Sequence, residues 1–185
     1  MQTIGHHTCS KEHGEHYVLV NSPFRSNYHE PFGKLPFLGS GYYFWDYNYE
    51  IAENWGFNHY NGNFFILEFV LQIPDELFLD LVGSRQAMEY IKMMISKMKD
   101  FGFDRPEWSL GAVIESLKKI NAKTPGSFPF EVVRAVDNSA LKEEVKVIFV
   151  DSKKNYTNLN PRLVICFLTK KEVFFESKKI VFSSK

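Results

Sequence analysis

Residues 38–45 have the sequence LGSGYYFW, in which a glycine-rich turn runs directly into a row of aromatic side chains. Gly39 and Gly41 lack a side chain, so the backbone can approach another group closely at both positions. Successive side chains of a strand point to opposite faces, so Tyr42 and Tyr43 are expected on different faces. This stretch predicts an aromatic strand with a glycine-lined edge, where a planar heteroaromatic ring can stack. A packed hairpin without a ligand is the alternative interpretation.

The segments on either side of this strand predict an α+β fold. Short apolar or alternating runs indicate strands, and apolar residues at helical spacing indicate helices. The order is strands, a central helical insert and then strands again, which is typical of α+β proteins and not of alternating β-α-β proteins. The predicted strands cover residues 3–8, 41–45, 63–72, 77–81, 145–150, 163–168 and 179–182, and the predicted helices cover residues 46–55, 84–102 and 106–120.

Local signals refine three of these segments. Asp46 is expected to cap the first helix, which Gly56 would end. Residues 11–20 are too polar and mixed for a firm assignment, although they allow a short helix. Residues 63–72 (NFFILEFVLQ) are so apolar that their strand is expected inside the sheet and not at its edge.

Length and composition limit the possible classes of protein. The chain has 185 residues, the usual size of one compact domain, so we predict a single domain over residues 1–185. Two cysteines are too few for a disulfide scaffold. No apolar run approaches the roughly 20 residues of a membrane span, and no secretory signal is present, so we expect a cytoplasmic protein with no membrane partner. The 22 basic and 22 acidic residues leave no general field that attracts nucleic acid.

Histidines are concentrated at the start of the chain. His6, His7, His13 and His16 lie within the first sixteen residues, together with Cys9. Imidazole and thiolate groups bind zinc, but this spacing matches no known finger or ribbon, so no metal is expected. Cys9 beside His6 could also form a nucleophile with its base, although a small buried hydrophobic residue is the commoner role of cysteine.

Two short motifs and the order of elements resemble the ADP-ribosyltransferase superfamily. Residues 5–8 (GHHT) and residues 39–44 (GSGYYF) are followed by the helix over 46–55, the strand over 64–71 and the segment 78–81 (FLDL). The likeness is to the branch that includes diphtheria toxin, the poly(ADP-ribose) polymerases and small bacterial toxin-like domains. It implies a split mixed or antiparallel sheet with a helical insert, and NAD as the donor of ADP-ribose.

The resemblance also implies a role for each motif residue. His6 would hydrogen-bond a ribose hydroxyl of NAD, and the backbone of His7 would hold the nicotinamide amide. Thr8 would lie beside the nicotinamide pocket. Tyr43 would stack on the nicotinamide ring, and Tyr42 would support it from the other side. By this resemblance His6 and Tyr43 are the catalytic residues, and the glycine-rich turn is part of the NAD site.

The chain departs from this pattern at Val164. The branch has a Glu or Gln before the strand that residues 165–167 resemble, and the carboxylate of the Glu stabilises the ribosyl cation or activates the acceptor. A valine here implies transfer of single ADP-ribose units, with the carboxylate supplied by the acceptor. Alternatively, Glu172 or Glu176 replaces it, or the site only binds.

The expected function is therefore that of an NAD-dependent mono-ADP-ribosyltransferase acting on a protein or a nucleic acid. Residues 21–40 contain three prolines and no clear element, and we expect this loop to cover the pocket. Arg25 within it is a candidate for a pyrophosphate contact, because its planar fork matches phosphate oxygens. Family likeness implies a toxin or phage-defence effector with an antitoxin partner. The alternatives are an inactive binding module and an NAD glycohydrolase.

Overall fold

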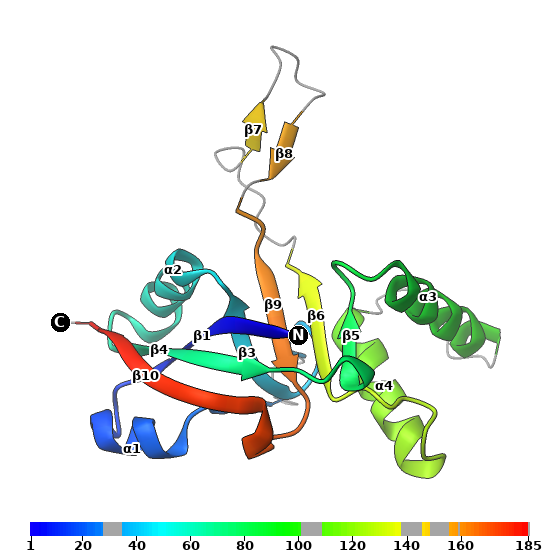
Figure 1. The fold of residues 1–185 in the computed structure, drawn as a ribbon, viewed down its shortest axis with the longest axis horizontal. Coiled ribbons are helices and arrows are strands. Elements are labelled where there is room, and N and C mark those ends of the chain that lie inside the picture. Colours follow the sequence, from blue (N-terminus) through cyan, green and yellow to red (C-terminus); the bar gives the residue numbers. More distant parts are fainter. Residues whose placement is uncertain (28–34, 101–108, 138–145, 149–155, 159, 185) are drawn as a thin grey trace.

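The computed structural model describes residues 1–27, 35–100, 109–137, 146–148, 156–158 and 160–184. Within these residues, eight strands form one open sheet in the order β10-β4-β1-β3-β9-β6-β5, with the short β2 paired to β3 (Figure 1). In chain order, their bounds are β1 Gln2–Ser10, β2 Arg25–Ser26, β3 Gly41–Asp46, β4 Phe64–Gln72, β5 Phe78–Asp80, β6 Val132–Val136, β9 Leu163–Phe167 and β10 Phe175–Ser183. A separate pair, β7 Lys146–Ile148 and β8 Tyr156–Asn158, projects away from this sheet.

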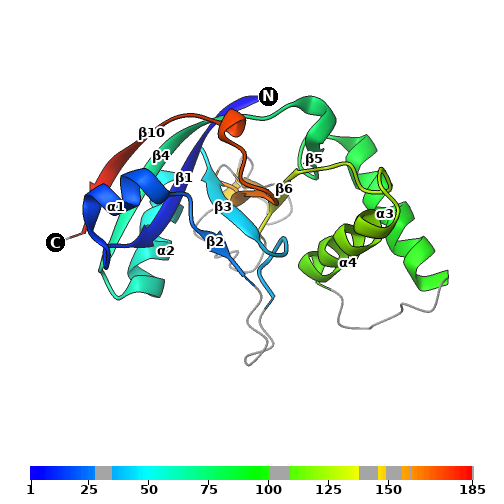
Figure 2. The same ribbon diagram turned by 90° about the horizontal axis from the view of Figure 1, so that it is seen from below.

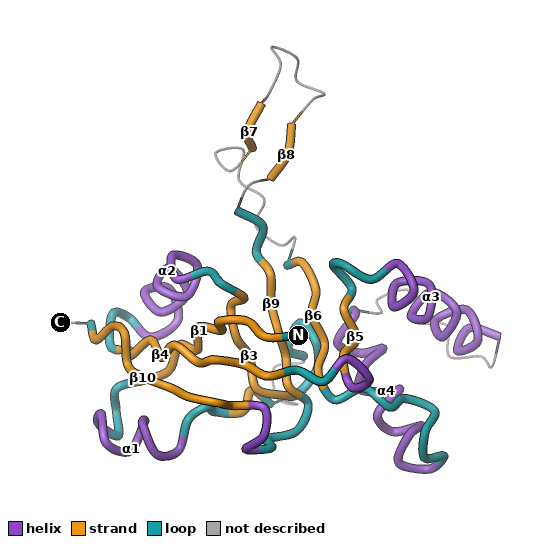
Figure 3. Tube along the Cα trace, in the orientation of Figure 1, coloured by secondary structure: helices purple, strands orange, loops and turns teal. Residues whose placement is uncertain are grey.

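Four α-helices are described, and two of them form the insert between β5 and β6. Their bounds are α1 Gly14–Asn21, α2 Tyr49–Tyr60, α3 Arg85–Asp100 and α4 Leu110–Lys123. Strands β5 and β6 are parallel, which requires a long connection such as the one that α3 and α4 provide, whereas every other pair in the sheet is antiparallel. The helices lie toward the two ends of the sheet and the strands run between them (Figures 2 and 3). The predicted α+β class, with a helical insert and a mixed sheet, is confirmed.

Each face of the sheet carries its own apolar cluster. The side that packs on α2, here called the α2 face, has a cluster that also takes in buried residues of α3 and α4. The opposite side, here called the α1 face, packs on Val18 of α1 and is rich in phenylalanine. Strand alternation assigns each side chain to one of these faces. The core of the α1 face is built from Phe44, Phe65, Phe69, Phe167 and Phe174 together with aliphatic side chains.

The predicted start and end of the first long helix are wrong. Asn48, and not Asp46, caps α2, because its side chain accepts a hydrogen bond from the backbone N–H of Ile51. Gly56 lies inside α2 and does not end it. A Cβ atom at position 56 would overlap the ring of Phe64, so glycine lets the helix pack closely on β4. The helix ends at Asn61 in a left-handed conformation with φ of 50°.

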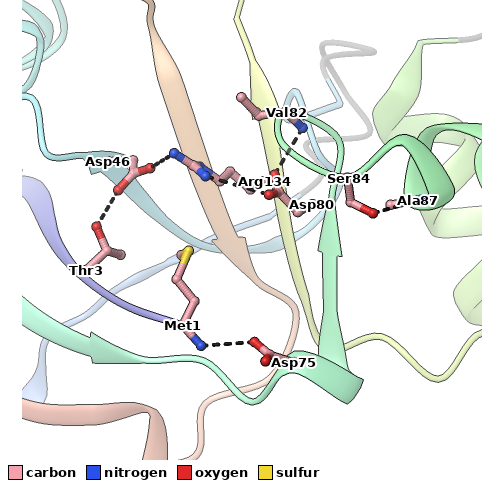
Figure 4. Close-up of polar contacts among 9 residues, drawn as sticks. All are labelled: Met1, Thr3, Asp46, Asp75, Asp80, Val82, Ser84, Ala87 and Arg134. Carbon is pink, nitrogen blue, oxygen red and sulfur yellow. Dashed lines mark hydrogen bonds and ion pairs between the residues drawn. The ribbon is translucent and has the colours of Figure 1, made fainter.

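Asp46 instead forms a buried ion pair on the α1 face. Its Oδ2 lies 2.7 Å from Nη2 of Arg134 on β6, and its Oδ1 accepts a hydrogen bond of 2.7 Å from Thr3 (Figure 4). Arg134 also lies 3.7 Å from a carboxylate oxygen of Asp80 on β5. The guanidinium therefore joins β3 to β6 across β9, and β6 to β5. Asp46 is at the end of its strand, where strand alternation directs it away from α2.

Other boundaries follow the predictions more closely. The apolar strand β4 lies inside the sheet, between β1 and β10, as predicted. Residues 14–21 form the short helix that the sequence allowed. Strand β6 (VVRAV) was not predicted, because a charged residue interrupts a short run that follows a proline-rich turn. The beginning of the helix predicted from residue 106 and both ends of the strand predicted over residues 145–150 lie outside the described residues.

Candidate functional site

A row of side chains crosses the sheet on the α2 face. His6 on β1 pairs with Trp45 on β3, and Trp45 pairs in turn with Val164 on β9. Tyr43 lies two residues before Trp45 and therefore shares this face. Three segments that are far apart in the sequence thus bring His6, Tyr43 and Val164 onto three neighbouring strands. These are the positions of the expected histidine, tyrosine and missing carboxylate.

The sheet opens beside this row. Strands β1 and β3 are fully described, and their pairing is limited to Gly5 with Asp46 and His6 with Trp45. Beyond His6, β1 continues to pair with β4, while β3 continues to pair with β9. The two halves of the sheet therefore separate immediately after His6.

His6 is buried, with 7% of its surface exposed. Its ring and that of Tyr49 on α2 form a T-shaped pair with 5.9 Å between centroids, and its Nε2 lies 3.8 Å from Oε2 of Glu68. Its Nδ1 is buried and has no hydrogen-bond partner among the described residues. Burial lowers the pKa of His6, and the nearby charge of Glu68 opposes this shift. The imidazole therefore has one nitrogen facing a carboxylate and one that is enclosed without a hydrogen-bond partner among the described residues.

His7 points to the opposite face, where it bridges the split. Its Nδ1 lies 2.9 Å from the carbonyl oxygen of Tyr43, and its Nε2 accepts the backbone N–H of Phe24 at 3.1 Å. A carbonyl only accepts, so the proton must be on Nδ1 and the lone pair on Nε2. Burial lowers the pKa of His7 to about 4, which keeps this neutral tautomer. The side chain of His7 thus has a structural role, while the role predicted for its backbone stays a prediction.

Thr8 and Tyr43 face α2 together with His6, but both hydroxyls have partners. Thr8 donates a hydrogen bond of 2.9 Å to the carbonyl of Ala52 in α2. The hydroxyl of Tyr43 donates to the carbonyl of Gly39 at 2.5 Å and accepts the N–H of Leu38 at 2.8 Å. Burial raises the pKa of Tyr43 well above its ordinary value, so the phenol stays protonated. Tyr43 therefore holds the glycine-rich turn in place.

Both glycines of this turn approach groups of the protein itself. Gly39 has a φ of +83°, and a Cβ atom there would lie 2.7 Å from the carboxylate of Glu115 on α4. A Cβ atom at Gly41 would overlap the sulfur of Cys166 on β9. Glu115 also accepts the N–H of Ser40 at 2.6 Å, so α4 anchors the turn. No sequence pattern indicates this role of Glu115, because it depends on how the insert folds back.

The remaining predicted residues are Tyr42 and Arg25, which lie off the row, and Val164 within it. Tyr42 is half-buried on the α1 face, and its register partner Arg25 on β2 is exposed. Val164 is only 4% exposed and packs in the apolar cluster of the α2 face. Residues 28–34 of the predicted covering loop lie outside the described part of the chain.

The glutamates weighed as replacements for the missing carboxylate do not join the row. Glu172 and Glu176 are both exposed, and both line a cavity of about 230 Å³ together with Phe69 and Lys178. None of the residues that line this cavity belongs to the predicted NAD site. The carboxylate that does face His6 is Glu68, whose register partner is His6 itself. Alternation along β4 could place Glu68 on the α2 face, but only the register places it beside His6.

The zinc and thiol alternatives gain no support from this geometry. His6 and His7 point to opposite faces of β1, and no group of three potential ligands gathers among the residues that the structure describes. Burial raises the pKa of Cys9 to about 12, so its thiol stays protonated and is a poor nucleophile. None of the described helices is both long and apolar enough to cross a membrane.

Comparisons with models of protein families, with curated proteins and with solved structures find no match to this chain.

Proposed function

We propose that this chain transfers single ADP-ribose units from NAD to a macromolecular acceptor, a protein or a nucleic acid. The observation that carries this proposal is the common placement of His6, Tyr43 and the Val164 position on adjacent strands and on one face, beside a split in the sheet. The short motifs alone do not require this arrangement, because a shift of one residue on any strand would reverse the face of its side chain.

We place the bound dinucleotide beside this row, at the split in the sheet. In this proposal the unpartnered Nδ1 of His6 bonds a ribose hydroxyl, which requires the packing around this buried atom to open. The ring of Tyr49 lies beside His6 and offers aromatic surface, and Tyr43 packs against the same apolar cluster. As nicotinamide leaves, positive charge develops on the ribose, and oriented dipoles in a site shielded from water stabilise that charge. Fixing the donor and the acceptor in one orientation supplies a further part of the rate enhancement.

A binding module on the same fold is the second candidate. Two observations favour it: Val164 has no group that can stabilise a cation, and the Tyr43 hydroxyl is already bonded within the chain. Such a module would bind NAD or a partner without consuming NAD. An NAD glycohydrolase would use the same residues but pass the ribosyl group to water, releasing free ADP-ribose.

The test is incubation of the purified chain with labelled NAD, alone, with cell lysate and with total RNA. His6→Ala is compared with His16→Ala, a matched change at an exposed position of α1. We expect label on a macromolecule with the wild type and with His16→Ala, and none with His6→Ala, while thermal unfolding shows that all three are folded. Absence of NAD turnover by the folded wild type would support the binding module, and release of ADP-ribose without labelling would support the glycohydrolase.

A further inference from the structure

Glu68 is the carboxylate closest to the predicted catalytic histidine. It lies on β4, directly opposite His6 on β1, and both side chains are on the α2 face. Its Oε2 is 3.8 Å from Nε2 of His6. Among the described carboxylates, no other comes as close to a ring nitrogen of His6.

A lysine on the next strand orients this carboxylate. Lys179 on β10 is the register partner of Glu68, and its Nζ lies 2.8 Å from Oε1. One oxygen is therefore held by an ammonium group, while the other faces the imidazole. The row on the α2 face thus extends from Lys179 through Glu68, His6 and Trp45 to Val164.

Exposure distinguishes Glu68 from the position that the resemblance assigned to a carboxylate. The side chain of Glu68 is 28% exposed, whereas Val164 is only 4% exposed and is enclosed by apolar groups. The side chain of Glu68 is therefore partly open to solvent, whereas that of Val164 is not. Glu53 of α2 is also nearby, but its contact is with the hydroxyl of Tyr49 at 3.5 Å and not with His6.

We propose that Glu68 is the catalytic carboxylate of this site, in the place that Val164 leaves without one. The proposal rests on the ADP-ribosyl transfer proposed above. In that transfer, the bond between nicotinamide N1 and ribose C1′ breaks, and its electron pair stays with nicotinamide. A lone pair of the acceptor forms the new bond to C1′. The proton of the acceptor passes to the carboxylate of Glu68 and then to water.

The test compares Glu68→Gln with Glu53→Gln by steady-state nicotinamide release and by transfer of labelled ADP-ribose. Glu68→Gln keeps the size of the side chain but removes its charge and basicity. We expect kcat to fall about 100-fold or more, with little change in the KM for NAD, because a general base acts mainly in the transition state. Glu53→Gln should keep the wild-type kcat. Glu68→Asp, which keeps a carboxylate, should retain more activity than Glu68→Gln and provides a second variant if the amide does not fold.

The outcomes separate this proposal from the one on which it rests. If the wild type and folded Glu68→Gln turn over NAD with the same kcat, transfer stands and the role of Glu68 is overturned. A folded wild type that turns over no NAD overturns the transferase function, and the catalytic role of Glu68 with it. Equal losses of kcat in Glu53→Gln and Glu68→Gln would show a general effect of charge removal near Tyr49 and would also overturn the specific role.

Discussion

The Nδ1 atom of His7 lies 2.9 Å from the main-chain oxygen of Tyr43, so a side chain joins β1 to β3 just beyond their last paired residues. The backbone pairing of β1 with β3 ends at His6, and at the next position the imidazole of His7 links the two strands. The same ring accepts the N–H of Phe24, which ties the segment after α1 to the split. Because both ring nitrogens are used, His7 must be neutral for this arrangement to persist.

Acidification should therefore destabilise the fold through His7. The ordinary pKa of 6.5 falls to about 4 in the folded chain because the ring is buried. Well above pH 6.5, His7 is neutral in both the folded and the unfolded chain, and its full contribution to stability is present. Between pH 6.5 and pH 4 the unfolded chain takes up a proton that the folded chain does not, so the free energy of unfolding should fall by about 3 kcal/mol.

Chemical denaturation at pH 7 and at pH 4.5 measures this loss. His7→Gln should show a smaller decrease between the two values than the wild type, and His16→Gln, altered at an exposed position, should show the same decrease as the wild type. Long-range ¹H–¹⁵N spectra should report a neutral ring with the proton on Nδ1 at pH 7. A ring protonated on Nε2 would contradict the assigned hydrogen bonds.

Tyr43→Phe should loosen the glycine-rich turn. The change removes the hydroxyl that joins Leu38 and Gly39, and it leaves the aromatic ring in the core. Loss of these two bonds should lower the free energy of unfolding by about 1–3 kcal/mol. Thermal or urea unfolding measures the cost, with Tyr47→Phe at an exposed position as the matched control. Equal stability of the two variants would show that water replaces the lost hydroxyl.

The ion pair of Asp46 and Arg134 should contribute to stability because both charges are largely shielded. Asp46 has 3% of its side chain exposed and Arg134 has 19%. Asp46→Asn leaves the guanidinium of Arg134 with the more distant Asp80 as its charged partner. We expect the free energy of unfolding to fall by about 2–3 kcal/mol, which is less than the cost of breaking a fully buried pair. A double-mutant cycle with Arg134→Met isolates the coupling. Additive losses would mean that the two groups do not interact.

Gly41→Ala should force β3 away from β9. The added Cβ would overlap both the sulfur of Cys166 and the main-chain oxygen of Phe167, and a backbone atom cannot move aside cheaply. We expect the free energy of unfolding to fall by about 1–3 kcal/mol, as it does when a core is overpacked. The control is Gly126→Ala, where nothing lies within 4 Å but φ is +88°, so that change costs conformational strain alone. A smaller loss at Gly41 than at Gly126 would contradict the close contact.

The sequence pattern predicted some elements well and others poorly, for physical reasons. Strand β4 was recognisable because it is buried on both faces and is apolar nearly throughout. The helix α2 was placed too early, because Asp46 and Asn48 are both good caps, and only the tertiary structure diverts Asp46 to Arg134. Strand β6 contains that same Arg134, whose charge broke an apolar pattern but is neutralised in the fold by two aspartates.

Some features of the candidate site could likewise be predicted from the sequence, and others could not. His6, Tyr43 and the Val164 position could be selected from short motifs, and the structure then placed His6 and His7 on opposite faces of β1. The groups that pack against Gly39 and Gly41 could not be predicted, because a glycine indicates that some group approaches closely but not which one. Here, protein groups on α4 and β9 occupy that space.

By itself, the sequence determined the type and approximate place of most of the longer elements, because helix and strand periodicity depend on residues close together in the chain. It also determined which side chains of each strand share a face. Only the tertiary structure decided which strands are neighbours and in what register, because long-range pairing depends on the packing of the whole sheet. That register placed Glu68 beside His6, Val164 beside Trp45 and the ring of His7 across the split.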